Sequence, residues 1–199
     1  MLDRLPRDLQ LEGEGVAIEP LAVEHLQGLA AAATDGALWD LKVTSVPHPD
    51  HLLKWYANAI EARDLDVQRP FVVRRKADQA IVGSTRYYDI EAEHHNLSIG
   101  YTWYAKSAQR TAVNTECKLI LLKHAFEDCG CAAVYWHTHH QNYASQAAIE
   151  RLGAKLDGVI RNHKRMSDGA LRDTYCYSMT NDEWPNVKAA LTARLAQNN

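Results

Sequence analysis

The apolar residues of this chain recur with two different periods, and these periods predict where its strands and helices lie. Short apolar, β-branched and aromatic runs predict strands over residues 16–20, 71–74, 80–90, 97–105, 132–138, 158–165 and 171–179. Apolar positions three or four residues apart predict helices over residues 23–33, 50–63, 115–127 and 143–152. A last helix is expected after Asn181, which would cap it, with Pro185 in its first turn. Residues 34–49, which include Gly36 and two prolines, are predicted to be irregular.

The resulting order of elements is β-α-α-β-β-β-α-β-α-β-β-α, which predicts an α/β or α+β fold around a mixed sheet. Gly130 and Gly153 mark the expected ends of two helices, and Ser167-Asp168-Gly169 predicts the turn of a closing hairpin. No internal repeat and no Pro/Gly/Ser-rich linker interrupts the 199 residues. We therefore expect one domain that spans residues 1–199.

Composition and charge narrow the possible functions. Hydrophobic residues make up 46% of the chain and charged residues 24%, values typical of a globular protein. A formal charge of -3 argues against a protein that binds nucleic acid by neutralising phosphates. The N-terminal residues are too charged for a signal peptide, no apolar run is long enough to span a membrane, and the cysteine spacing fits no zinc module. We therefore expect a cytoplasmic protein with reduced thiols that binds neither nucleic acid nor a membrane.

The loop between the strand at 97–105 and the helix at 115–127 has the chemistry of an anion site. A loop that runs directly into a helix presents unpaired backbone N–H groups and the positive end of the helix dipole. Arg110 adds a formal positive charge at the same place. This combination suits a pyrophosphate group, although an ordinary turn between a strand and a helix has the same pattern.

Two motifs in this part of the chain resemble those of the GNAT superfamily of N-acetyltransferases, in particular its RimJ/RimL-type branch. The family signature Gln/Arg-x-x-Gly-x-Gly/Ala, followed in this branch by Thr-Glu-Ala, corresponds here to Gln109-Arg110-Thr111-Ala112-Val113-Asn114 and then Thr115-Glu116-Cys117. Ala112 and Asn114 stand where the signature has its small residues. The second motif, Asn-x-x-Ser at the start of a helix, corresponds to Asn142-Tyr143-Ala144-Ser145. The likeness covers about residues 14–191.

The resemblance implies a GNAT fold, a mixed and mostly antiparallel twisted sheet of about seven strands flanked by helices, with acetyl-CoA as co-substrate and no metal. It assigns these residues to acetyl-CoA: Tyr101, Thr102, Trp103, Gln109, Arg110, Thr111, Ala112, Val113, Asn114 and Asn142. Backbone of the first three would hold the pantetheine arm and polarise the thioester carbonyl, and amides of residues 110–114 would take the pyrophosphate. Asn142 would bond the arm, and Ser145 would donate a proton to the departing thiolate. On the residues alone, Asn142 and Ser145 are equally typical of helix caps.

The same resemblance implies an amine as the acetyl acceptor, either a protein N-terminus or a small molecule. An α-amine has a pKa of about 8 and needs little more than a water relay, whereas a lysine, with a pKa of about 10.4, needs a base. The candidate bases are Asp89, Glu91, Glu93, His139 and His140, and the sequence does not choose among them. Trp39, Tyr87 and His139 are predicted to line the acceptor site, with Tyr88 and Trp103 as further candidates.

Two other functions compete with acetyl transfer. His137 and His139 share a face of a strand and could bind zinc, but no third ligand has a recognisable spacing. A GNAT fold without activity could instead serve as a CoA sensor or an assembly subunit, as the altered loop with Ala112 and Asn114 suggests. Turnover over a panel of amines separates an enzyme from an idle fold, and elemental analysis tests for zinc. A homodimer is possible, and the acceptor is not identified.

Overall fold

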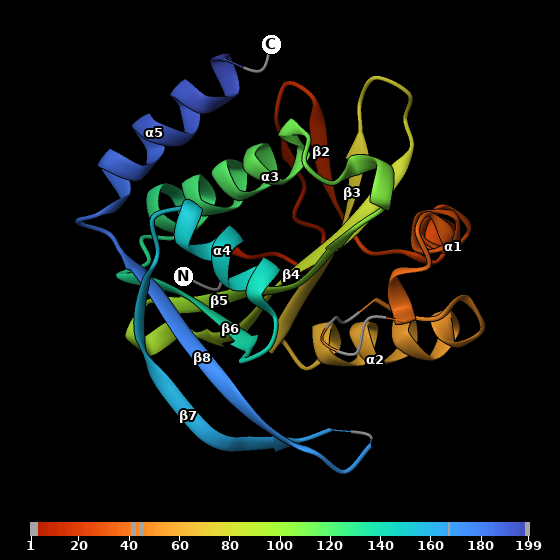
Figure 1. Cartoon of the computed structure of the whole chain (residues 1–199). Coiled ribbons are helices and arrows are strands. Elements are labelled where there is room, and N and C mark those ends of the chain that lie inside the picture. Colours follow the sequence, from red (N-terminus) through yellow and green to blue (C-terminus); the bar gives the residue numbers. More distant parts are fainter. Residues whose placement is uncertain (1–3, 41–42, 44–45, 167, 198–199) are drawn as a thin grey trace.

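The computed structural model of the chain describes residues 4–40, 43, 46–166 and 168–197. Among these residues eight strands form one sheet in the order β1-β2-β3-β4-β5-β6-β8-β7 (Figure 1). The strands are β1 (Leu11–Glu12), β2 (Val16–Pro20), β3 (Gln68–Arg75), β4 (Ile81–Glu91), β5 (Asn96–Tyr104), β6 (Ala133–His139), β7 (Lys155–Arg165) and β8 (Leu171–Thr180). The α-helices are α1 (Leu26–Thr34), α2 (Leu52–Asp64), α3 (Ala112–Lys123), α4 (Tyr143–Arg151) and α5 (Trp184–Ala196).

The sheet is mixed and mostly antiparallel, as the sequence predicted. Within the described part of the chain, β5 and β6 are the only parallel neighbours, and their pairing is confined to Asn96–Ser98 on β5. The strand that was not predicted is β1, which has two residues and therefore no periodicity to detect. It pairs with β2 through Leu11 and Ile18.

The helices cover the two faces of the sheet, and alternate residues of β4 show which helix lies on which face. Arg86 stacks on the ring of Trp55, which belongs to α2. Its neighbour Tyr87 points the opposite way and donates a hydrogen bond to the carbonyl of Leu121 in α3 at 2.7 Å. Figure 1 shows α2 and α3 on opposite sides of the strands. None of the described helices has the length and the run of apolar residues that crossing a membrane requires.

The structure also contains the predicted irregular segment and the predicted hairpin. In the described part of the chain between α1 and α2, the regular structure consists of short 3-10 turns at Leu38–Asp40 and Pro49–His51. The hairpin turn between β7 and β8 is closed by the N–H of Met166, which donates to the carbonyl of Ala170 at 2.8 Å. Gly169 has φ +86, the left-handed conformation that favours glycine, while Ser167 lies outside the described residues.

Two helix starts differ from the prediction. Helix α3 begins at Ala112 because Thr111 caps it, accepting a hydrogen bond from the N–H of Val113 at 3.3 Å, and it continues past Lys123 as one π-helical turn, His124–Asp128. Asn181 does not cap the last helix, so this prediction was wrong: its N–H donates to Ala132 at 3.0 Å and keeps it at the edge of the sheet. The N-cap is Glu183, with Pro185 in the first turn as expected.

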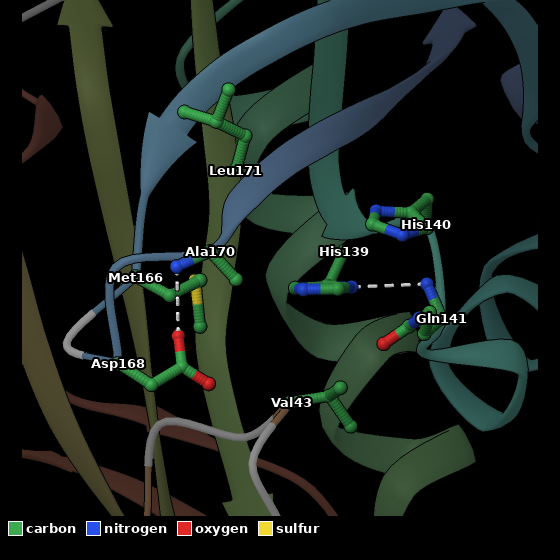
Figure 2. A pocket seen from close by; sticks show the side chains of 8 residues that line it. All are labelled: Val43, His139, His140, Gln141, Met166, Asp168, Ala170 and Leu171. Atoms are coloured by element: carbon green, nitrogen blue, oxygen red, sulfur yellow. Dashed lines mark hydrogen bonds between the residues drawn. The ribbon is translucent and has the colours of Figure 1, made fainter.

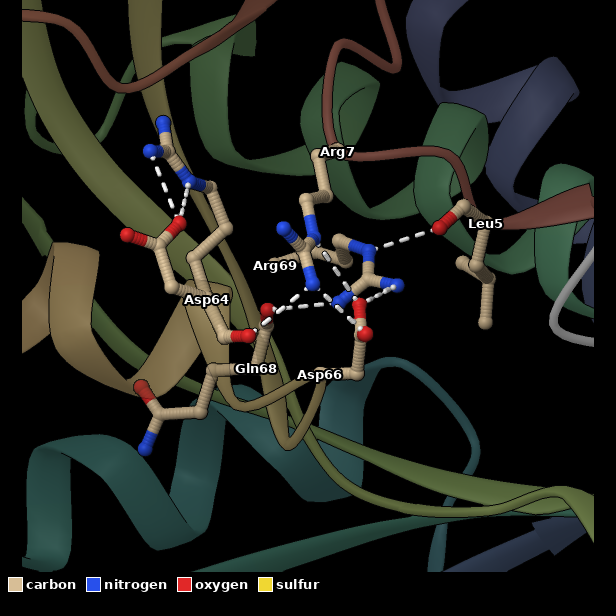
Figure 3. A network of polar contacts seen from close by, with 7 residues as sticks. Leu5, Arg7, Asp64, Asp66, Gln68 and Arg69 are labelled. Atoms are coloured by element: carbon tan, nitrogen blue, oxygen red, sulfur yellow. Dashed lines mark hydrogen bonds and ion pairs between the residues drawn. The ribbon is translucent and has the colours of Figure 1, made fainter.

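A polar network fastens the N-terminal segment to the turn between α2 and β3 (Figure 3). Arg69, of which only 4% is exposed, donates from Nε to the carbonyl of Leu5 at 2.6 Å and from Nη2 to Asp66 at 3.0 Å. Arg7 pairs with the same carboxylate at 2.7 Å. The Arg7 guanidinium holds the pKa of Asp66 below its usual value. The network fixes Gln68, the first residue of β3, because its carbonyl accepts from Arg69 at 3.0 Å.

Candidate active site

A cleft opens in the middle of the sheet where β5 and β6 part. Their pairing ends at Ser98, so the edge of β5 from there to Tyr104 lacks hydrogen bonds to β6 within the described residues. A bulge lies in this stretch: the register with β4 shifts between Ser84 and Arg86, and Tyr101 has φ +51. Free backbone groups on a strand edge can pair with an extended ligand. The three predicted residues, Tyr101 to Trp103, lie at this bulge and just after it.

A buried lysine lies beneath the bulge, on the side of α3. Lys118 is 5% exposed, and its Nζ donates a hydrogen bond to Oγ1 of Thr102 at 2.9 Å. Thr102 Oγ1 also lies 2.8 Å from Oγ1 of Thr85 on β4. Burial lowers the pKa of Lys118 to about 8. Lys118 could not be singled out from the sequence, because a lysine in a helix is usually exposed and no local pattern shows that this one points inward.

The N-terminus of α3 has the features of an anion site. The first N–H groups of a helix have no partner within it, and here they belong to Thr111, Ala112, Val113 and Asn114. Of these N–H groups, only that of Val113 donates a hydrogen bond to Oγ1 of Thr111 in the described structure. Arg110 is exposed and has φ +61, which turns the chain into the helix. The remaining amides fit a pyrophosphate, and the start at Ala112 places that residue's methyl group in the first turn.

Asn142 and Ser145 lie together at the start of α4. The side chain of Asn142 caps this helix, because its Oδ1 accepts a hydrogen bond from the N–H of Ser145 at 3.1 Å. Its Nδ2 donates to the carbonyl of Val43 at 3.0 Å, so it also ties α4 to the segment between α1 and α2. Ser145 is partly exposed. Asn142 therefore caps the helix, as its sequence position allowed. The cap uses the N–H of Ser145 and not its hydroxyl, for which the described residues show no hydrogen bond.

A pocket of about 260 Å³ lies between the end of β6 and the β7–β8 hairpin (Figure 2). It is lined by Val43, His139, His140, Gln141, Met166, Asp168, Ala170 and Leu171. The ring of His139 points into it, and its Nδ1 accepts a hydrogen bond from the N–H of Gln141 at 3.0 Å. Burial lowers the pKa of His139, so the ring is neutral at neutral pH and carries its proton on Nε2. His139 therefore offers a hydrogen-bond donor to the pocket.

Two of the other predicted acceptor residues, Tyr87 and Trp39, are not among the residues that line this pocket. Tyr87 is fully buried, packs edge-on against Phe71 and bonds to α3, so it belongs to the core and cannot line an acceptor site. Its neighbour Tyr88 faces the other side and reaches His137 Nδ1 at 3.1 Å. Trp39 packs on His48 in the segment between α1 and α2, with 5.0 Å between ring centres.

The candidate bases after β4 and the histidine pair give no base with a clear geometry. Asp89, Glu91 and Glu93 are exposed. His140 lies against His139, with 4.4 Å between ring centres, and its Nδ1 accepts from the N–H of Asp173 at 3.2 Å. No group of three His, Cys, Asp or Glu side chains that could hold a metal is found in the described residues.

Two buried or half-buried arginines were not predicted at all. Arg86 on β4 and Arg172 on β8 each have a buried Nε that makes no hydrogen bond to any described residue. The two arginines belong to strands that are far apart in the sequence. Their spacing in the sequence therefore does not predict that both lie within electrostatic range of Tyr101. Only the sheet order and the bulge bring them to one place.

Known proteins resemble this chain in sequence and in fold. Residues 16–155 match the family model described as an acetyltransferase (GNAT) domain. A protein of T. thermophilus classed as an acetyltransferase is 32% identical, with 94% of this chain and 96% of that one covered and a TM-score of 0.80. A GCN5-related N-acetyltransferase from Brucella melitensis is 27% identical, with 96% and 86% covered and a TM-score of 0.85. No curated protein matches.

A third structure bears on the RimJ/RimL-type branch. The RimJ of Mycobacterium smegmatis, solved in complex with CoA-disulfide, is 19% identical, with 96% of this chain and 94% of that one covered and a TM-score of 0.74. At this identity the likeness is one of fold. It places RimJ among the structural neighbours, but it does not assign the chain to that branch.

Proposed function

The chain belongs to the GNAT acetyltransferase family, and from that premise we propose that it transfers an acetyl group from acetyl-CoA to a primary amine, either the α-amine of a protein or a small amine. The observation that carries the proposal is the parting of β5 and β6 beside the bulge at Tyr101. A free strand edge, a bulge and a helix N-terminus follow one another along the chain here, in the order that a long ligand with a pyrophosphate at one end requires.

The residues of the cleft divide the work of holding acetyl-CoA, whose thioester supplies the acetyl group. Backbone groups at Tyr101 and Thr102 pair with the extended arm. The amides at the start of α3 take the pyrophosphate, with Arg110 beside them. The ammonium of Lys118, fixed on Thr102, places a positive charge beneath the bulge, where negative charge on the thioester oxygen is favoured.

The acceptor side of the mechanism rests on orientation and proton transfer. The amine enters from the side of the His139 pocket, and His139 donates from Nε2 to a carbonyl or hydroxyl of the acceptor. Ser145 donates the proton that the departing thiolate requires. No described carboxylate is placed as a dedicated base, which favours an acceptor of low pKa such as an α-amine, since about a tenth of it is neutral at neutral pH.

The first experiment is a calorimetric titration of the protein with acetyl-CoA, with CoA and with pantetheine. Micromolar binding of both CoA forms and much weaker binding of pantetheine is expected, because the helix N-terminus contributes only through the phosphates. Acetyl transfer is then measured by mass spectrometry over peptides and small amines. No binding of either CoA form would refute the proposal. Tight binding without transfer to any amine would favour a CoA-binding protein without activity.

A further inference from the structure

Arg86 is a buried cation on the face of the sheet that carries α2. Only 5% of the residue is exposed. Its guanidinium carbon lies 4.9 Å from the centre of the Trp55 ring and 4.7 Å from the centre of the Tyr101 ring. Stacking of this kind covers the flat faces of a guanidinium and leaves its edge, where the N–H donors point, available for hydrogen bonds.

The donors on that edge are only partly used. Nη1 of Arg86 donates to Oε1 of Gln68 at 2.8 Å, but Nε is buried and has no hydrogen-bond partner among the residues that the structure describes. In the described part of the chain no carboxylate forms an ion pair with Arg86. A buried charge with unused donors lowers stability unless an anion pairs with it.

Arg69 shows how this fold treats a buried arginine that has a structural role. It is as buried as Arg86, at 4% exposed, yet it has a carboxylate partner in Asp66 and backbone acceptors at Leu5 and Gln68 (Figure 3). Gln68 links the two sites, because its side chain accepts from Arg86 and its carbonyl from Arg69. Among the described residues nothing pairs with Arg86 as Asp66 pairs with Arg69, and this contrast points to a bound molecule as the partner of Arg86.

A second arginine approaches the same place from β8. Arg172 is half-buried, its Nε is buried without a partner, and it too has no ion pair among the described residues. An ionised Tyr101 would raise the pKa of both guanidinium groups, so Arg172 lies within electrostatic range of this side chain. Arg86 contacts the ring of Tyr101 directly, and the bulge residue is open to a ligand because 40% of it is exposed.

The space beside Arg86 has room for a small ligand. A pocket of about 310 Å³ is lined by Trp55, Asn58, Gln68, Arg86 and Tyr101. Burial lowers the pKa of Arg86 to about 10, so the guanidinium is still charged at neutral pH. The lining of this pocket therefore combines one cation and two aromatic rings with the amide groups of two polar side chains. Such a lining suits an anion with an apolar body.

We propose that Arg86 binds an anionic group of the acceptor, so that the protein acetylates amines that also carry a carboxylate. The inference rests on the proposed function for the position of the thioester at the bulge. Arg86 pairs directly with Gly100, the residue before Tyr101, so a carboxylate on Arg86 keeps the amine of the same molecule beside the bulge. A planar carboxylate matches the two-pronged edge of a guanidinium, and a phosphate shares this chemistry.

The test compares acceptors that differ only in charge. The value of kcat/KM is measured for an amino acid, for its amide and for the corresponding amino phosphonate, with wild type and with Arg86→Met, Arg86→Lys and Arg172→Met. Arg75→Met is the matched control, because Arg75 pairs with Asp78 in the β3–β4 turn away from the cleft. The ratio of acid to amide, compared between variant and wild type, cancels the difference in amine pKa between the two acceptors.

Wild type is expected to prefer the acid or the phosphonate, and Arg86→Met to lose about 10- to 100-fold of that preference through KM. Arg86→Lys should keep part of it, Arg172→Met should lose less, and Arg75→Met should lose none. An equal preference in wild type and Arg86→Met would overturn the inference while acetyl transfer itself stands. If Arg86→Met does not fold, Arg86→Lys still decides the question.

A binding measurement separates this inference from the proposed function. The probes are an N-acetyl amino acid and its amide, titrated into the protein saturated with CoA. Tighter binding of the acid that is lost in Arg86→Met supports the anion site even if no acceptor is turned over. Equal binding of acid and amide, or no binding of the acid to wild type, overturns it.

Discussion

Lys118→Met tests whether a charged lysine is buried beneath the bulge. Lys118 is 5% exposed, and burial lowers its pKa from 10.5 to about 8. Because the folded-state pKa is the lower one, the unfolded chain binds this proton more tightly between these two pH values. The free energy of unfolding must then rise with pH across that range. A pKa difference of about 2.5 corresponds to a total rise of about 3 kcal/mol.

The assay is urea unfolding of wild type and variant at several pH values from about 7 to about 10.5, compared as the difference between the two proteins. The buried Tyr104 phenol, whose pKa burial raises, destabilises both proteins at high pH and so largely cancels in this difference. Burial also raises the pKa of Cys117, but the Lys118 charge opposes that rise, so the contribution of this thiol cancels only in part. Lys123, exposed in the same helix, provides the control Lys123→Met. That control should run parallel to wild type.

The expected result is a difference between wild type and Lys118→Met that changes by about 3 kcal/mol in favour of wild type as pH rises. The absolute difference at neutral pH depends also on the lost hydrogen bond to Thr102, and only its pH dependence is predicted. Parallel curves for the two proteins would refute the reasoning, because they would mean that Lys118 titrates alike in the folded and unfolded chain.

Three further substitutions test single assignments. Tyr87→Phe removes one of two donors to the buried carbonyl of Leu121, the other being the N–H of His124, so urea unfolding should show a loss of about 1 kcal/mol with the acceptor KM unchanged. A changed KM at equal stability would mean that Tyr87 does act at the acceptor site. Ser145→Ala should lower kcat by about 10²–10⁴-fold and leave CoA affinity unchanged in calorimetry, and equal turnover would remove Ser145 from the mechanism. Ala112→Gly should tighten CoA binding several-fold by removing a methyl group from the first turn of α3. Unchanged affinity would mean that this methyl group does not limit the approach of phosphate.

The order of elements could be predicted because it depends on local patterns. Val16–Pro20 and the strands β3, β4 and β5 bury alternate or continuous apolar residues, and such runs carry their own signal. Gly153 and Gly169 have positive φ values, as their places after a helix and in a hairpin turn predicted. The prediction failed at Asn181 because a contact far away in the sequence determines its conformation. Its N–H bonds to the carbonyl of Ala132, next to the neighbouring strand β6, and the residue does not cap the helix that follows it.

The candidate site was predicted in part, for the same reason. The start of α3 and the start of α4 have local sequence signals, and the structure places Thr111 and Asn142 as the caps of these helices. The environment of Arg86 and Arg172 has no such signal. Each is one charged residue in a strand, and Arg86 comes to lie on Tyr101 only through the pairing of β4 with β5.

The error at Tyr87 shows how one position decides between core and site. Neighbouring residues of a strand point to opposite faces, so a sequence that offers Tyr87 and Tyr88 together does not say which of them lines the cleft. The choice follows from the face that α3 covers. Tyr87 bonds to α3, and Tyr88 therefore faces Tyr101, with 5.2 Å between ring centres.

The bulge in β5 determines which face of the sheet Tyr101 and Thr102 point to. Gly100 pairs with Arg86 and shares its face, so in a regular strand Tyr101 would point to the side of α3. The extra residue keeps Tyr101 on the face of Arg86, and a Cβ at Gly100 would lie 2.6 Å from the Tyr88 ring. The same shift turns Thr102 towards Lys118. One inserted residue thus interrupts the regular edge of β5 beside the thioester and places a cation on each face of the sheet there. It explains why Arg86 and Lys118 both lie at the bulge and not elsewhere on the sheet.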